Sequence, residues 1–249
     1  MFKAEMADAR LLRDSLEAVA ELIDEGEFII GKDGIRLIAS DRAVVAVVDY
    51  FISKNAFEKY EFAEDAKLGI NMGNFMNILR RAKNERFSMS ADGNGLSVSF
   101  HGDSSRHFTL PVIDVSREET PDLVKLESGF TTAFAVDTEA LASGVEDAEL
   151  VGDSIIFTVR KDMFILHSEG DSSSTRLEML PSPSLDMIKV SEPVRARYSV
   201  DYMKKMLKAR KLSDRARVSL ASEYPMKLSF SVPDKVELSF ILAPRVEEG

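Results

Sequence analysis

The chain has 249 residues, of which 45% are hydrophobic and 30% charged, and its formal net charge is −10. No window approaches the roughly 18 apolar residues that cross a bilayer, and the N-terminus carries charges at Glu5, Asp8 and Arg10 where a secretory signal has its apolar core. Cysteine is absent, which excludes disulfides and thiolate metal sites. We therefore expect an intracellular globular protein.

The first predicted elements are a strand at 2–6 and a helix at 9–23 with Asp8 as its N-cap. One apolar stripe with spacings of four, three and four marks this helix, formed by Leu12, Leu16, Val19 and Ile23. An Asp33-Gly34 turn joins two short β-prone runs, 27–31 and 35–40, which predicts a hairpin. The run 44–52 is typical of a buried strand.

A second helix is predicted at 71–83, followed by strands at 86–90, 96–100 and 106–112. The first half is thus expected to order as strand, helix, three strands, helix and three strands. The segment Pro111–Glu127, with the sequence PVIDVSREETPDLVKLE, is predicted to be an extended crossover near the middle of the chain.

The second half repeats the first at a shift of about 128. The run 198–211 overlays 70–83 without a gap, a helix stripe follows a capping Asp137, and a hairpin recurs at 154–171. The repeat predicts two like domains in an α+β fold, each with two helices on one face of antiparallel sheets. We place the domains at 1–116 and 128–249, joined by a crossover at 117–127.

Charge is sorted along the chain even though the average is acidic. From 72 to 86 four basic residues face Glu85 alone, and from 201 to 217 seven basic residues face two acidic ones. Lys204, Lys208 and Lys211 recur at helical spacing on one face. Basic faces at two repeat-related positions favour phosphate contacts, with solvated helix faces as the alternative. Such contacts would not depend on base sequence, because no aromatic residues are interleaved for base stacking and no recognition-helix motif is present.

Other chemistry has weak support. The run 26–33 nearly matches a phosphate-binding loop, but its last position is Asp33 and its interior is an apolar strand. His101, His107 and His167 have no metal-ligand or triad spacing, and turn chemistry accounts for acidic residues in the hairpins. A carboxylate-dependent nuclease using Asp41 is a remote alternative that metal-dependent cleavage would reveal. We expect no catalytic residue, no metal and no cofactor.

Four stretches carry a resemblance to a known family: GIRLIASDRAVVAVVDY, INMGNFMNILRRAK, IDVSREETPDL and the C-terminal ILAPRVEE. Together they resemble the archaeal and eukaryotic sliding clamps of the proliferating cell nuclear antigen (PCNA) family. The resemblance implies a fold of the DNA-clamp type, in which three subunits close into a ring around duplex DNA. The three subunits are identical in most members and differ from one another in some archaea.

The resemblance also implies a processivity factor in replication and repair that is not an enzyme. Its expected partners are DNA polymerase, flap endonuclease and DNA ligase, which bind through PIP-box peptides, and a clamp loader that opens the ring. The expected location is the cytoplasm and nucleoid in an archaeon or the nucleus in a eukaryote. A subunit of a heterotrimeric or checkpoint-type clamp, acting as a partner-binding scaffold, is the alternative.

By this resemblance, DNA contacts fall on basic residues of three helices: Arg10, Arg13, Arg80, Arg81, Lys83, Lys204, Lys205, Lys208 and Lys211. The helix at 137–149 departs from the family pattern, since it has five acidic residues and no basic one. We expect either that DNA tilts away from it or that a partner subunit supplies the missing charge.

The resemblance also implies that partner peptides bind in a pocket formed by the segment after Asp41, the crossover and the C-terminal tail. The middle of the crossover is charged, at 117–120, so we hypothesise that anchoring shifts to flanking apolar residues including Val112 and that the acidic middle attracts basic peptide flanks. The partner-binding candidates are Val44, Val45, Val47, Val115, Leu123, Pro225, Ile241, Leu242, Ala243 and Pro244.

Subunits are expected to join through edge strands at 106–112 and 174–180, because pairing covers edges that would otherwise aggregate. The interface candidates are Arg106, His107, Phe108, Thr109, Leu110, Thr175, Arg176, Leu177, Glu178 and Met179.

Overall fold

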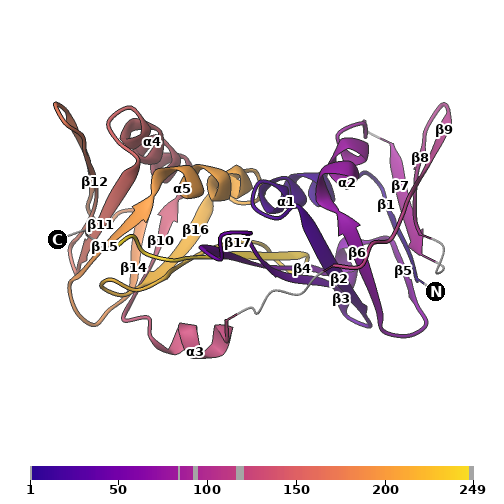
Figure 1. Ribbon diagram of the computed structural model, residues 1–249, viewed down its shortest axis with the longest axis horizontal. Coiled ribbons are helices and arrows are strands. Elements are labelled where there is room, and N and C mark those ends of the chain that lie inside the picture. The colour runs from indigo at the N-terminus through magenta and orange to yellow at the C-terminus, as the bar shows by residue number, and fades with distance from the viewer. Residues whose placement is uncertain (1, 84, 92–94, 116–120, 247–249) are drawn as a thin grey trace. The chain divides into compact units, whose positions relative to one another are not determined.

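The computed structural model describes residues 2–83, 85–91, 95–115 and 121–246 (Figure 1). It separates into two compact units. Unit 1 comprises 1–120 and 231–238, and unit 2 comprises 121–230 and 239–249.

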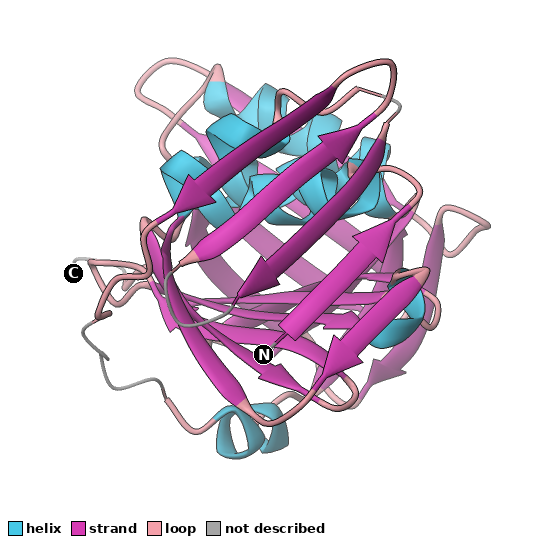
Figure 2. Cartoon of the chain, turned by 90° about the vertical axis from the view of Figure 1, so that its right-hand side faces the viewer, coloured by secondary structure: helices cyan, strands magenta, loops and turns pink. Residues whose placement is uncertain are grey.

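The described residues of unit 1 form two α-helices and two antiparallel sheets. One sheet has the order β5-β1-β7-β8-β9, and Figure 2, which faces unit 1, shows neighbouring strand arrows pointing in opposite directions. In the second sheet of unit 1, the first part of β18 lies at one side and the strands next to it are, in order, β4, β3, β2 and β6. The elements are β1 (Phe2–Met6), α1 (Arg10–Ala20), β2 (Glu25–Gly31), β3 (Gly34–Ser40), β4 (Ala46–Ser53), the 3₁₀ turn η1 (Lys54–Ala56), β5 (Lys59–Phe62), β6 (Ala66–Asn71), α2 (Met72–Leu79), β7 (Arg86–Ala91), β8 (Leu96–His101) and β9 (Ser105–Leu110).

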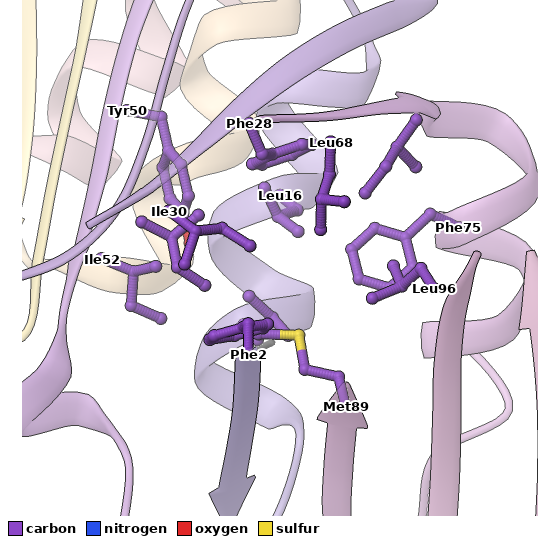
Figure 3. Close-up of a pocket in the computed structure, with 13 residues that line it drawn as sticks. Phe2, Leu16, Phe28, Ile30, Tyr50, Ile52, Leu68, Phe75, Met89 and Leu96 are labelled. Atoms are coloured by element: carbon purple, nitrogen blue, oxygen red, sulfur yellow. The ribbon is translucent and has the colours of Figure 1, made fainter. Parts of the chain in front are cut away.

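The core of unit 1 lies between its helices and its sheets. Leu16 of α1, Phe75 of α2 and Phe2 of β1 converge there with side chains of β2 and β4 around a gap of about 20 Å³ (Figure 3). The Tyr50 hydroxyl on its wall is paired with Ser15 at 3.0 Å. The remaining walls are apolar and offer no polar partner that would hold a water, so this gap is a packing defect and not a binding site.

Unit 2 repeats this plan. One sheet has the order β14-β10-β16-β17 and then the last part of β18, and the other has the order β13-β12-β11-β15. In its core the rings of Phe134 and Phe157 pack on Phe164, and the ring of Tyr198 packs on Phe157. The elements are α3 (Leu123–Ser128), β10 (Thr132–Asp137), α4 (Thr138–Glu149), β11 (Ser154–Arg160), β12 (Met163–Glu169), β13 (Ser174–Met179), β14 (Leu185–Val190), β15 (Val194–Ser199), α5 (Val200–Leu207), the 3₁₀ turn η2 (Lys208–Leu212), β16 (Arg215–Leu220), β17 (Met226–Val232) and β18 (Val236–Leu242).

The α+β class with helices beside antiparallel sheets is confirmed, but four strands escaped prediction: β5, β6, β14 and β15. The KYEF run of β5 is short and polar, and its position depends on distant contacts. The Tyr60 hydroxyl donates to the carbonyls of Gly31 and Gly34 at 2.6 and 2.9 Å, and burial raises the pKa of Tyr60 to about 12. Such contacts leave no local pattern in the sequence.

Two helix predictions are corrected. The N-cap of α1 is Ala9, which has no side-chain cap bond, and not Asp8. Asp8 lies one residue earlier and accepts from the N–H and the guanidinium of Arg10. The helix predicted at 71–83 starts where expected, with Asn71 as an N-cap that accepts from the Asn74 N–H at 2.9 Å. Its α-helical part ends at Leu79, earlier than predicted.

Among its described residues, the crossover begins as a chain beside β6 and ends as a short helix. The Ile113 N–H donates to the Gly69 carbonyl at 2.9 Å, so this stretch runs beside β6 within unit 1. A Cβ at Gly69 would lie 2.0 Å from the Ile113 oxygen, which explains the glycine. The prediction of an extended chain is wrong at 123–127, where α3 forms behind its N-cap Asp122.

Candidate nucleic-acid and partner interfaces

The candidate cations of α1 are paired with neighbouring carboxylates. Arg10 donates from Nε and Nη2 to Asp8 at 3.1 and 2.8 Å, and these bonds hold the pKa of Asp8 below its ordinary value. Arg13 donates from Nε to Asp14 at 2.9 Å. Both pairs are local in sequence, so a phosphate would have to compete with them for these two arginines.

The α2 candidates lie at the helix end and in the turn that follows it. Arg80 is the C-cap, and its guanidinium is 3.9 Å from Glu17 of α1. Arg81 and Lys83 are exposed and have no ion-pair partner within the described part of the chain. Three basic side chains near a helix C-terminus are electrostatically favoured there, and they remain accessible to a phosphate.

Arg106, an interface candidate, contacts the turn that follows α2. Its guanidinium pairs with Glu85, donates to the Arg81 carbonyl at 3.2 and 3.3 Å, and lies 5.0 Å from the centre of the Phe100 ring. Arg106, Glu85 and the turn at 80–83 line an open groove within unit 1 together with the loop at 102–104. Arg106 therefore supports the Arg81 turn as well as belonging to edge strand β9.

In unit 2 the candidate cations extend beyond α5. Lys204 and Lys205 lie in α5, whereas Lys208 and Lys211 lie in η2 and are exposed. A 3₁₀-helix has three residues per turn, so Lys208 and Lys211 still share a face. Lys205 pairs with Asp201 at 2.8 Å and lies 5.3 Å from the centre of the Tyr202 ring.

The acidic helix α4 finds its counter-charges within the same unit. Lys204 pairs with Glu149, and Arg210 of η2 contacts Glu139 at 3.3 Å and Glu146 at 3.0 Å. Arg210 was not among the predicted DNA-contact residues. Its position between Lys208 and Lys211 in the basic run was a signal for it, but its acidic partners are more than 60 residues away in the sequence.

The segment after Asp41 is a turn built around a buried carboxylate. Asp41 accepts the N–H groups of Ala43, Val45 and Ala46 at 3.2, 2.8 and 2.7 Å. This fold of the turn places Val44 at φ 55° with 57% of its surface exposed. A β-branched residue in the left-handed region is strained, which is typical of functional positions. Asp41 therefore serves to hold this turn.

The other partner-binding candidates differ in access. Val45, Val115, Leu123, Pro225, Ala243 and Pro244 are half-buried. Val47, Ile241 and Leu242 are buried within β4 and β18, so they support the surface and do not form it.

The tail after β18 is anchored in unit 2, where the Arg245 N–H donates to the Arg197 carbonyl at 2.8 Å and its guanidinium pairs with Asp153 at 2.6 Å. That pair lowers the pKa of Asp153. The charged and polar residues predicted to steer partners, Arg117, Glu118, Glu119 and Thr120, lie outside the described residues, as do the last three of the tail.

Both predicted joining strands are at sheet edges. In the described part of the chain β9 has β8 as its one strand neighbour, and β13 has β12. The β9 candidates His107 and Thr109 and the β13 candidates Arg176 and Glu178 are exposed, whereas Phe108, Thr175, Leu177 and Met179 are half-buried and Leu110 is buried. The edges therefore have backbone and side chains available for a further strand.

The histidines lie on sheet surfaces. His101 and His107 contact each other edge to face at 5.9 Å between ring centres and pair with serines, while His167 pairs with Glu169. Within the described ranges, no group of three or more His, Cys, Asp or Glu side chains could hold a metal ion.

Comparison with known proteins accounts for both halves of the chain. Residues 1–117 match the family model "Proliferating cell nuclear antigen, N-terminal domain", and residues 127–245 match the corresponding C-terminal domain. The chain belongs to the proliferating cell nuclear antigen family. The resemblance seen in the sequence is therefore confirmed.

Individual PCNA-family proteins match over nearly the whole length. A protein of Methanothermobacter thermautotrophicus named DNA polymerase sliding clamp is 34% identical over 249 residues, 99% of each chain. A protein of Pyrococcus furiosus with the same name is 33% identical over 250 residues, again 99% of each chain. The crystal structure of PCNA from Thermococcus kodakaraensis superposes with a TM-score of 0.88 at 26% identity, covering 98% of this chain and 100% of that one.

A membrane-spanning helix is not found in the described residues: none of their helices is both long enough and apolar enough.

Proposed function

We propose that this chain is a DNA polymerase sliding clamp, a ring that encircles duplex DNA and tethers replication and repair enzymes to it. The observation that carries the proposal is the match of both halves to the family, in the right order and over the full length of relatives bearing that name. In this role the chain performs no chemistry of its own and needs no cofactor. The archaeal sources of the relatives support action at the nucleoid.

DNA contact is proposed for the basic residues of the helices, with different strengths. Arg81 and Lys83 are exposed beside the C-terminus of α2 and are proposed as the main phosphate contacts of unit 1, with Arg80 beside them. Arg10 and Arg13 are proposed to contribute less, because each is already paired with a carboxylate. Lys204, Lys205, Lys208 and Lys211 are proposed as the contacts of unit 2. Contacts of this kind are blind to base sequence and weaken with salt.

Partner binding is proposed to depend on the Asp41 turn, the crossover and the tail. Exposed Val44 on a rigid turn can act as an apolar anchor for a PIP-box peptide, and half-buried Val115 of unit 1 and Leu123 of unit 2 are proposed as further apolar contacts. DNA polymerase, flap endonuclease, DNA ligase and the clamp loader are the proposed partners. We propose domains at 1–116 and 128–249 with the crossover at 117–127.

The proposed assembly is a homotrimer closed by pairing of β9 with β13 of the next subunit. Light scattering of the purified protein tests it: the mass expected is three times the 27.7 kDa of one chain. A monomer that assembles only with other clamp subunits would support the heterotrimeric alternative instead. A monomer under all conditions would overturn the ring.

A salt titration of duplex DNA binding tests the contacts. Replacement of Arg81 and Lys83 by alanine is expected to flatten the log–log salt dependence by about 0.9 for each phosphate that is no longer neutralised. Replacement of Arg10 by alanine should flatten it less. Equal slopes for the Arg81 and Lys83 variant and the unmodified protein would remove these residues from the DNA surface.

A further inference from the structure

The helix α4 and the basic run beside it form a single charged surface within unit 2. The two helices α4 and α5 lie side by side (Figure 1). The elements α4, α5 and η2 contain five basic and five acidic residues, so this surface is formally neutral. The basic ones are Lys204, Lys205, Lys208, Arg210 and Lys211, and the acidic ones are Glu139, Glu146, Asp147, Glu149 and Asp201.

The acidic side chains are placed to hold specific cations. Glu139 and Glu146 are seven residues apart, which is two helical turns, so both point from the same face of α4. They contact the Arg210 guanidinium from two positions, at 3.3 and 3.0 Å, and Glu149, one turn further along, pairs with Lys204. All five side chains are at least one-third exposed, so water and a polyanion can reach each pair.

A cation whose charge is already balanced by a carboxylate neutralises no phosphate and releases no counterion from DNA. Exposed ion pairs are weak, however, so a phosphate can exchange with the carboxylate at little cost. The carboxylates of α4 would then compete continuously with DNA for the same cations. A ring that is held on DNA by its topology needs contacts that break easily while it moves.

We propose that α4 is a built-in competitor of DNA: Glu139, Glu146 and Glu149 hold Arg210 and Lys204 and thereby keep the phosphate affinity of this surface low. This inference rests on the proposed function and adds to it a residue-level control of how tightly the clamp grips the duplex. It also answers the question raised by an acidic helix in a DNA-facing position, since the balancing charge comes from the same unit.

The test compares Glu139→Gln/Glu146→Gln with the unmodified, assembled protein. A short fluorescent DNA duplex is titrated by anisotropy across a series of NaCl concentrations. Glutamine keeps the size of each side chain and removes its charge, which releases Arg210. In a plot of the logarithm of the binding constant against the logarithm of the salt concentration, the slope of the double variant should be steeper by about 0.9 for each additional phosphate that it neutralises. For each such phosphate, a fourfold rise in salt should then lower the affinity of the variant by roughly a further threefold.

Two further variants test whether a steeper slope comes from Arg210 and not from the change in net charge. Glu192→Gln/Asp162→Asn removes the same two charges from exposed loops outside the helices, and its slope should equal that of the unmodified protein. Adding Arg210→Gln to the double variant should abolish the steeper slope, because the released cation is then absent.

The outcomes separate the inference from the proposed function. If the unmodified protein binds DNA and the double variant has the same slope, or if the loop variant steepens the slope equally, the competitor role of α4 is overturned and the clamp function stands. If the unmodified protein neither binds the duplex nor is retained on circular DNA by a clamp loader, the proposed function fails and the inference with it.

Discussion

At the scale of single residues, Asp41 and Val44 show how a buried polar group fixes an exposed apolar one. The sequence predicted Val44 as the start of a buried strand, because it opens a run of apolar residues. The strand instead begins at Ala46, since the Asp41 carboxylate captures the preceding N–H groups into a turn. Such side-chain capture competes with regular structure and is difficult to read from hydrophobicity.

Replacing Val44 by asparagine should raise stability and weaken partner binding. Asparagine tolerates the left-handed region far better than valine, so relief of strain is expected to add about 1 kcal/mol to the free energy of unfolding. Denaturant unfolding would measure this gain. Affinity for a PIP-box peptide should fall in the same protein, because an exposed apolar anchor is lost.

Val124→Asn is the matched control, since Val124 is 80% exposed and lies in α3. Valine and asparagine have similar helix propensities, so no gain in stability is expected there. An equal gain at both positions would show that Val44 is not strained, and unchanged peptide affinity at Val44 would remove it from the partner surface.

At the scale of elements, α3 is the part of the crossover that the sequence did not predict. Its six residues, LVKLES, are too few to show a helical stripe, and isolated helices of that length are unstable. Contacts within unit 2 support it: the Tyr224 hydroxyl donates to the Leu126 carbonyl at 3.3 Å, and Lys227 pairs with Glu127. The helix therefore depends on residues about 100 positions away.

Replacing Gly129 by alanine should loosen α3. The backbone of Gly129, at φ −83°, is open to any residue, but an added Cβ would lie 2.6 Å from the Tyr224 ring and hydroxyl. Moving that ring breaks its bond to Leu126, at an expected cost of about 1–3 kcal/mol. Hydrogen exchange of the Leu126 and Gly129 amides should accelerate, and the melting temperature should fall.

The helix α2 provides a control for the same substitution. A Cβ at Gly73 meets only the Asn71 side chain, at 3.5 Å, so Gly73→Ala should stabilise the protein by about 0.5–1 kcal/mol. If Gly129→Ala were equally harmless, the close approach of Tyr224 would not be what holds α3.

At the scale of the whole molecule, the duplication was the feature most readable from sequence. A shift of about 128 residues preserves helix stripes, hairpin turns and basic runs, and these local patterns predicted two α+β domains. Ion pairs such as Glu146 with Arg210 could not be predicted, because they depend on which helices pack together. The same holds for the edge positions of β9 and β13, which follow from sheet order.

Lysines on the free edge of β9 should weaken assembly. His107 and Thr109 are exposed, so His107→Lys/Thr109→Lys should leave the subunit folded while opposing the approach of a second strand. Sedimentation should show a shift from three times 27.7 kDa toward 27.7 kDa at equal protein concentration.

The control Ser97→Lys/His101→Lys adds the same charge to exposed positions of β8, which already has a neighbour on each side. Equal dissociation of both variants would argue against strand pairing at β9.

The division of β18 between the units has a consequence for synthesis on the ribosome. Unit 1 includes 231–238, and the Ser53 N–H at the end of β4 donates to the Lys235 carbonyl at 2.8 Å. The first 120 residues therefore emerge without the segment that completes their second sheet, and more than a hundred further residues must be translated before it arrives. Domains of multidomain chains generally fold in order as they emerge. In this chain the first domain should stay incomplete until 231–238 emerge near the end of translation, and β4 should remain an uncovered edge until then.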